Sequence, residues 1–287
     1  MRPTSGAQPV TAPAVRAHKG GPPLVMVTAY DAPTARIADE AGADVVLVGD
    51  SVAMVVLGYD DTLQVTVADM AHHVAAVARA RPRALVVADL PWLSYHVSPE
   101  DTVRNAGALV RAGASAVKLE GGRRRLPAVR AILDAEIPVM GHLGLTPQSV
   151  HALGGYRVQG RQVDTAGALV DDAVALAEAG CFALVLECVP AEVAALVTAG
   201  VDVPTIGIGA GPHCDGQVLV LHDLLGLEDR IVGRFVRRYA SLKADAVTAV
   251  SAFAADVRAG RFPSEDESYR LADDVAAALD RPVPRTA

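Results

Sequence analysis

Short apolar runs that alternate with stretches of helical periodicity are the feature that most restricts the fold of this chain. In these runs Val, Ile, Leu and Ala follow one another directly, which is typical of strands buried on both faces. They lie at residues 24–28, 45–48, 84–87, 116–119, 138–140, 183–186 and 204–208. We expect an eighth, weaker strand around residues 230–236.

The segments between these runs have the 3.6-residue period of helices, for example at residues 66–79 and 165–179. Strands and helices that alternate over 287 residues predict an α/β protein, a single (β/α)₈ barrel of the TIM type. An open, doubly wound sheet is the alternative. Aromatic residues make up only 4% of the chain, so small branched side chains must fill the core.

Three segments are expected along the chain. Residues 1–21 are rich in Pro, Ala and Gly and predict a flexible lead-in. Residues 22–270 form the barrel with its C-terminal helices, including a helical stretch at 240–258. Residues 271–287 form a tail with a short helix near 272–279.

Charge and cysteine content exclude several classes of function. A net charge of −7 argues against nucleic acid as a partner, because phosphate binding requires clustered Lys and Arg. The three cysteines, Cys181, Cys188 and Cys214, form no C-x-x-C pair, which indicates a reduced, cytoplasmic protein. The N-terminus lacks the apolar segment of a signal peptide, and no apolar run reaches the roughly 20 residues that span a membrane.

Charged side chains follow the predicted strands, at the ends that meet on one side of a parallel barrel. They are Asp50, Asp89, Lys118, Glu120, His142 and Glu187. Singly, an Asp in this place often caps the next helix, and a His is usually structural. Together they are a stronger signal, because buried charge is costly unless it is paired or bound to a metal. The sequence therefore predicts a catalytic cluster at the barrel mouth, where barrel enzymes place their chemistry.

The types of side chain in this cluster indicate the type of ion. Carboxylates without a cysteine pair or an H-E-x-x-H segment favour a hard cation such as Mg²⁺. We expect Asp50 and Asp89 to be its ligands, with a chelating substrate completing the shell. The glycine-rich run at residues 207–211 does not fit G-x-G-x-x-G and predicts a close-packed turn, not a dinucleotide site.

Ordered segments from about Val25 to Tyr269 resemble the ketopantoate hydroxymethyltransferase family. They include M-V-T-A-Y-D at 26–31, V-G-D-S at 48–51, A-D-L-P at 88–91, V-K-L-E-G at 117–121, V-M-G-H-L-G-L-T-P-Q at 139–148, L-E-C-V-P at 186–190 and T-I-G-I-G-A-G at 205–211. One departure is Val52–Ala53–Met54, where the family usually has Leu-Gly-Met. It changes the loop after the second strand but removes no proposed catalytic group.

The resemblance implies a barrel of the phosphoenolpyruvate/pyruvate-binding type. It implies transfer of a hydroxymethyl group from 5,10-methylenetetrahydrofolate, the co-substrate, to 3-methyl-2-oxobutanoate. The product, 2-dehydropantoate, lies on the route to pantothenate and coenzyme A. It also implies one Mg²⁺ per subunit, a cytoplasmic homodecamer and no nucleic-acid or membrane partner.

Residue roles follow from the same resemblance. Metal binding falls to Asp50 and Asp89, with support from Glu120. The oxo acid contacts Ser51, Asp89 and Lys118, with His142 nearby. Glu187 is the general base.

Two other functions remain open from the sequence alone. One is a different Mg²⁺-dependent 2-oxo acid C–C lyase on the same barrel, similar to isocitrate lyase. Those lyases carry a Cys in a K-K-C-G-H type of segment, and this chain has none. The other is a non-catalytic oligomeric barrel that only binds a metabolite, for which we would expect some of the mouth residues to be missing.

Overall fold

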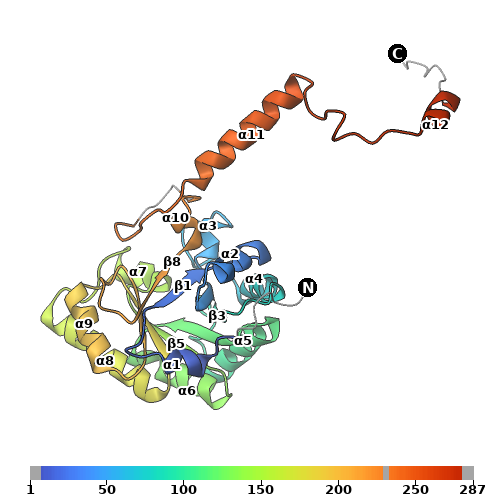
Figure 1. Ribbon diagram of the computed structural model, residues 1–287. Coiled ribbons are helices and arrows are strands. Elements are labelled where there is room, and N and C mark those ends of the chain that lie inside the picture. The colour runs from blue at the N-terminus through green and yellow to red at the C-terminus, as the bar shows by residue number, and fades with distance from the viewer. Residues whose placement is uncertain (1–7, 229–232, 280–287) are drawn as a thin grey trace. The chain divides into compact units, whose positions relative to one another are not determined.

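Eight parallel strands pair in chain order and close into a barrel (Figure 1). The computed structural model describes residues 8–228 and 233–279. From β1 to β8 the strands span Leu24–Thr28, Val45–Val48, Leu85–Asp89, Ala116–Glu120, Val139–Gly144, Ala183–Glu187, Thr205–Ile208 and Gly216–Leu219. Strand β8 pairs with β1 and completes the ring. The predicted fold class is confirmed.

Helices connect the strands, and their ends follow local sequence rules. From α1 to α12 they span Ala12–Arg16, Ala32–Glu40, Val52–Val55, Val67–Arg79, Pro99–Ala112, Leu126–Asp134, Val150–Leu153, Val163–Ala179, Ala191–Gly200, Leu221–Leu224, Leu242–Arg258 and Asp273–Ala278, with 3₁₀ turns η1 at Arg123–Arg125 and η2 at Pro147–Ser149. Thr66 and Asp69 form a reciprocal capping box that starts α4. Gly113 and Gly180 end α5 and α8 with φ of +118° and +110°, which favours glycine.

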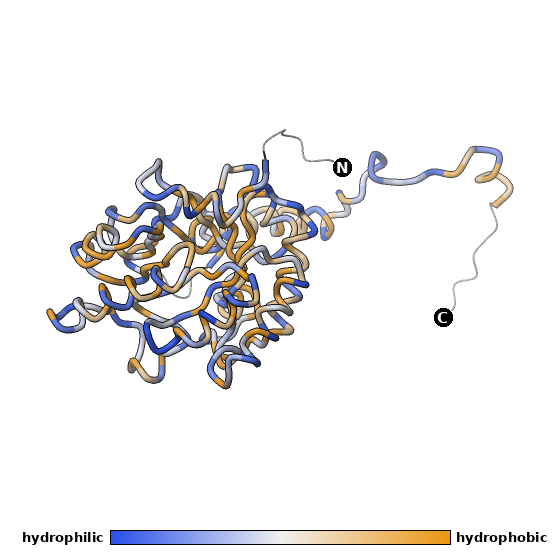
Figure 2. Tube along the Cα trace, turned by 90° about the horizontal axis from the view of Figure 1, so that it is seen from below, coloured by the Kyte–Doolittle hydropathy of each residue, from blue (hydrophilic) through white to orange (hydrophobic). Residues whose placement is uncertain are grey.

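The strands bury side chains on both faces, in two separate apolar layers. One layer fills the barrel interior with alternate residues such as Val45, Leu47, Leu85 and Val87. The other packs the remaining strand residues against the surrounding helices. Figure 2 shows hydrophobic segments recurring between hydrophilic ones along the chain. The two-residue period of a strand therefore decides which side chains point into the barrel.

Helix α1 lies within the segment that the sequence predicted to be a flexible lead-in. Its N-cap Thr11 accepts a hydrogen bond from the Ala14 backbone N–H. Ala12 and Val15 are buried and belong to the same apolar layer as the strand interiors. Residues 12–16 thus contribute to the barrel core instead of preceding it.

The eighth strand is the clearest difference from the sequence prediction. It lies at Gly216–Leu219, not around residues 230–236, of which 230–232 lie outside the described residues and 233–236 form no strand. Only alternate residues of β8 are buried, so it lacks the continuous apolar run of the other strands. At Gly216 a Cβ would lie 2.6 Å from the Leu24 carbonyl oxygen, so this pairing requires glycine.

The chain divides into two compact units, residues 1–240 and 241–287. The sequence prediction had assigned residues 241–270 to the barrel. The second unit contains α11 and α12, and none of their described residues is buried. In the described ranges, 8–228 and 233–279, we find no helix with the length and apolarity needed to cross a bilayer.

Substitution of Val15 by Ala tests whether α1 is part of the core. Val15 is 1% exposed, so the loss of two methyl groups should lower the free energy of unfolding by about 2 kcal/mol in urea denaturation. Val163→Ala is the matched control, because Val163 is 88% exposed and its loss should change stability by less than about 0.5 kcal/mol. Equal effects of the two substitutions would contradict the core assignment.

Candidate active site

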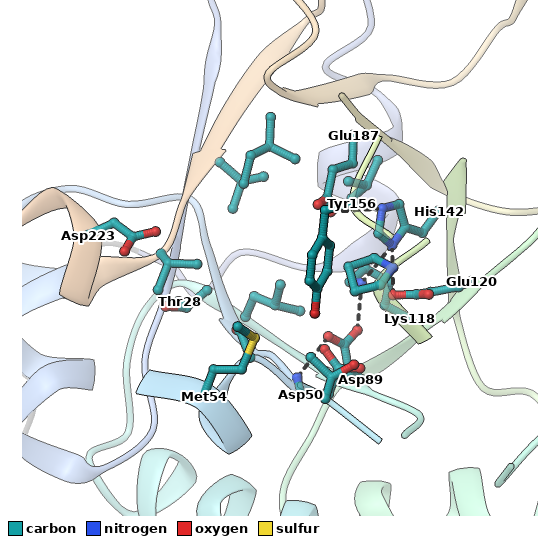
Figure 3. Close-up of a pocket in the computed structure, with 18 of the residues that line it drawn as sticks. Thr28, Asp50, Met54, Asp89, Lys118, Glu120, His142, Tyr156, Glu187 and Asp223 are labelled. Atoms are coloured by element: carbon teal, nitrogen blue, oxygen red, sulfur yellow. Dashed lines mark hydrogen bonds and ion pairs between the residues drawn. The ribbon is translucent and has the colours of Figure 1, made fainter. Parts of the chain in front are cut away.

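A cavity of about 180 Å³ opens at the carboxyl ends of the strands, where the sequence predicted a site. It brings together every site residue named from the sequence: Asp50, Ser51, Asp89, Lys118, Glu120, His142 and Glu187. Figure 3 shows the side chains of Asp89, Lys118, Glu120, His142 and Glu187 converging from different strands, with Asp50 beside Asp89. Another strand-end acid, Asp31, instead caps α2 by accepting the Thr34 backbone N–H at 2.8 Å.

Strand register explains the convergence. Asp89 lies two residues after the interior-facing Val87, and Lys118 and Glu120 continue the interior face from Ala116. Asp89 is the cross-strand partner of Lys118. In the next pair Glu120 is opposite His142. The charged residues therefore take interior positions toward the carboxyl ends of β3, β4 and β5, above the apolar layer.

An ion pair joins the two charged residues at the centre of the site. Lys118 Nζ lies 2.8 Å from Asp89 Oδ1, and both side chains are about 95% buried, at 5% and 4% exposure. The second oxygen, Asp89 Oδ2, accepts a hydrogen bond from the Asp50 backbone N–H at 3.1 Å. Asp89 thus links the end of β3 to the loop that carries Asp50.

Three buried carboxylates, those of Asp50, Asp89 and Glu120, surround this one lysine. Burial, with the negative charges of Asp89 and Glu120, raises the pKa of Asp50 well above its usual range. Burial also raises the pKa of Asp89, although Lys118 opposes the shift. For Lys118, burial alone would lower the pKa, but the three carboxylates outweigh it and raise it. The site therefore holds a permanent ammonium, while burial and mutual repulsion disfavour the full ionisation of Asp50 and Asp89.

His142 lies between two carboxylates. Its Nδ1 is 3.4 Å from Glu120 Oε1, and its Nε2 is 3.2 Å from Glu187 Oε2. Burial lowers the pKa of His142, as does Lys118, whose Nζ is 3.3 Å from Nδ1. The two carboxylates outweigh both effects and raise this pKa to about 9. His142 can thus hold Glu187 at a fixed place beside the cavity.

Gln148 is a site residue that the sequence did not reveal. Its Nε2 donates to Asp50 Oδ2 at 2.7 Å and to the Leu90 carbonyl at 3.0 Å. Its backbone N–H donates to Glu120 Oε2 at 3.1 Å. Its Oε1 accepts from the Tyr95 hydroxyl at 2.6 Å. One buried residue thereby orients two of the three carboxylates, Asp50 through its side-chain amide and Glu120 through its backbone N–H.

Ser51, predicted to contact substrate, also lines the cavity. Its hydroxyl shares a 2.8 Å hydrogen bond with the hydroxyl of the buried Tyr30. Burial raises the pKa of Tyr30, so the phenol stays protonated and can donate to Ser51. In that arrangement Tyr30 orients the Ser51 hydroxyl, and Ser51 can donate its own proton to a ligand.

The rest of the cavity wall is mostly apolar and was not anticipated from the sequence. Its apolar members are Leu47, Met54, Val185, Ile208, Val218, Val220 and Phe235. Four polar residues stand among them, Thr28, Thr62, Tyr156 and Asp223. In Figure 3 Asp223 lies across the cavity from His142 and Glu120. A ligand in this cavity therefore meets a charged side and an apolar side.

The donor set fits a divalent cation at Asp50 and Asp89. No three His, Cys, Asp or Glu side chains in residues 8–228 and 233–279 form a ready-made metal cluster. A hard cation that keeps waters and takes substrate oxygens needs only one or two carboxylates. Such an ion would favour the ionised form of Asp50, whose pKa is raised by burial and by the neighbouring charges of Asp89 and Glu120. Glu120 is already engaged by Gln148 and His142, which suits support rather than direct ligation.

The sequence profile of the family described as ketopantoate hydroxymethyltransferase matches residues 9–265. This chain belongs to that family. A 3-methyl-2-oxobutanoate hydroxymethyltransferase of Methylobacterium sp. (strain 4-46) is 59% identical over 271 residues, 94% of each chain. One from Moorella thermoacetica is 58% identical over 263 residues, covering 91% of this chain and 98% of that one.

Solved structures with the same fold are far less similar in sequence. Phosphonopyruvate hydrolase aligns with a TM-score of 0.59 at 15% identity, over 93% of this chain and 94% of its own. A 2,3-dimethylmalate lyase, a member of the PEP mutase/isocitrate lyase superfamily, aligns with a TM-score of 0.55 at 17% identity, over 94% and 97%. These likenesses show the same barrel fold, while the family match separates this chain from the lyases.

Substitution of Gln148 by Leu should remove the hydrogen bonds of the buried amide while keeping its approximate volume. The free energy of unfolding should fall by about 1–3 kcal/mol, because Asp50 and the Tyr95 hydroxyl lose a partner. Urea denaturation measures the change, with the exposed Gln64→Leu as control. If both variants unfold at the wild-type midpoint, the amide does not organise the site.

Proposed function

We propose that this chain is a 3-methyl-2-oxobutanoate hydroxymethyltransferase that uses 5,10-methylenetetrahydrofolate and serves pantothenate synthesis. Family membership supports the reaction. The observation that carries the mechanism is the convergence of Asp50, Asp89, Lys118 and Glu187 on one cavity. In the net reaction carbon 3 of the oxo acid loses a proton and gains the methylene carbon, water supplies the hydroxyl, and tetrahydrofolate leaves.

The oxo acid is held by its polar end. Ser51, Asp89 and Lys118 line the polar side of the cavity, where the keto and carboxylate oxygens lie. The branched alkyl end packs on apolar side chains such as Leu47 and Val185. A cavity with one charged and one apolar side suits a small branched 2-oxo acid better than a phosphorylated or dicarboxylic one.

Asp50 and Asp89 would hold Mg²⁺, and Glu120 would support the site through its hydrogen bond from Gln148, which also binds Asp50. The bound ion supplies Lewis-acid polarisation of the keto group. The Lys118 ammonium lies beside Asp89 and adds positive charge where the enolate oxygen develops. Because Lys118 is buried, this stabilisation is stronger than it would be in water.

Glu187 removes the proton from carbon 3. Its carboxylate is 16% exposed and lines the same cavity as Lys118. The contact with His142 Nε2 holds this carboxylate in place. The resulting carbanion forms the new bond to the methylene carbon of the co-substrate, and water releases the hydroxymethyl product. Cys188, the next residue, is not a nucleophile, because burial and the Glu187 charge raise the pKa of its thiol to about 11.

Assembly and localisation follow from the family in the same way. We expect a cytoplasmic homodecamer that binds small molecules. Exposed apolar residues of α11 support subunit contacts, since Val250 and Phe253 are 65% and 53% exposed.

Deuterium exchange at carbon 3 of 3-methyl-2-oxobutanoate separates this function from its rivals. The wild-type protein with Mg²⁺ should exchange this proton without folate and form 2-dehydropantoate only when 5,10-methylenetetrahydrofolate is added. Glu187→Gln should slow exchange by roughly 10²-fold or more, since it removes the base. The exposed Glu192→Gln should exchange normally. Exchange at the normal rate in Glu187→Gln would remove Glu187 from this role.

Asp89→Asn tests the metal assignment by calorimetry. The wild type should bind the oxo acid only with Mg²⁺ present, and chelation of the metal should abolish the heat of binding. Asp89→Asn should show no metal-dependent binding, because it loses a ligand charge and the partner of Lys118. Circular dichroism controls for folding. An unchanged titration of a folded variant would refute the assignment.

A further inference from the structure

Asp223 is a carboxylate of the cavity that the oxo acid chemistry does not use. It belongs to α10, which begins directly above β1, because the Leu221 backbone N–H donates to Thr28 Oγ1 at 3.0 Å. This bond fixes the helix at the mouth of the barrel. Figure 3 shows the Asp223 carboxylate directed toward the cavity, on the side away from His142 and Glu120.

The Asp223 side chain has acceptor capacity to spare. It is half-buried, and within the described part of the chain no hydrogen bond or ion pair engages its oxygens. Burial raises its pKa to about 6, aided by Glu228, while Arg238 acts in the opposite direction. A partly desolvated carboxylate with free oxygens favours a ligand that presents N–H donors.

The cavity that Asp223 lines also has apolar walls, which suit a flat ring. Met54, Val218, Val220 and Phe235 are among its apolar lining residues. The Phe235 ring lies against the backbone turn at Gly209, where an added Cβ would be 2.9 Å from the ring. An aromatic bicycle placed here would pack on aliphatic and aromatic carbon, with one edge at Asp223.

We propose that Asp223 binds the 2-amino-4-oxopyrimidine edge of the pterin of the tetrahydrofolate co-substrate. That edge carries a ring N–H and an exocyclic amino group side by side, and a carboxylate accepts both. The other end of the bicycle carries the methylene carbon and faces the side of the cavity where Glu187 and Lys118 act. This inference rests on the proposed function and adds to it the recognition of the co-substrate.

The assignment makes Asp223 a binding residue for one substrate only. Removal of the proton from carbon 3 needs the oxo acid, Lys118 and Glu187 but no folate. Transfer of the hydroxymethyl group needs the co-substrate as well. A change at Asp223 should therefore affect the second reaction and spare the first.

Asp223→Asn is the test, because asparagine keeps the shape but turns an NH₂ donor toward the pterin donors. The KM for 5,10-methylenetetrahydrofolate should rise roughly tenfold to hundredfold, as expected for lost charge-assisted hydrogen bonds. Calorimetric affinity for tetrahydrofolate should fall by the same factor. Exchange at carbon 3 without folate should stay at the wild-type rate, which also shows that the variant is folded. The exposed Asp60→Asn is the control for the change in net charge.

Two results would overturn the inference. An unchanged KM and tetrahydrofolate affinity in Asp223→Asn would show that the carboxylate does not contact the pterin. Loss of folate-independent exchange would show that Asp223 serves the oxo acid or the fold. A wild-type protein that exchanges no proton at carbon 3 would instead refute the proposed function itself.

Discussion

The ion pair between Lys118 and Asp89 is the interaction around which the site is arranged. It places an ammonium among three buried carboxylates, and burial raises the pKa of two of them, Asp50 and Asp89, so that their ionised forms lack full compensation from the protein. Such an arrangement does not stabilise the protein, because buried charge without full compensation destabilises the fold. It is well suited to a divalent cation and an anionic substrate, which together complete the balance.

The sequence was sufficient to predict the barrel and the charged side of its mouth. Continuous Val-rich runs marked seven of the eight strands, and the acids at their ends fell in one cavity. Register explains this success: Asp89 and Lys118, like Glu120 and His142, are direct cross-strand partners. Side chains on the interior face of neighbouring parallel strands must converge at the mouth of the barrel, because strand register alone sets their direction.

The missed features depend on tertiary contacts that leave no local pattern. Strand β8 has only two buried residues and needs Gly216 for its close approach to β1, so its sequence has no apolar run. Gln148 follows Pro147 in a short 3₁₀ turn, and its importance lies in partners far along the chain, such as Asp50 and Tyr95. Asp223 is one acid in a four-residue helix. The start of this helix is held at the cavity by the hydrogen bond from the Leu221 backbone N–H to Thr28.

Helix α1 contributes to the apolar layer that lies beneath the charged residues of the site. Val15 and Ala12 join the apolar layer that fills the interior below the charged residues. This layer keeps water away from the lower side of Lys118 and Asp89, and so keeps the local dielectric constant low. Attraction between charges grows as the dielectric constant falls. A five-residue helix that touches no ligand thereby strengthens the electric field in which the substrate reacts.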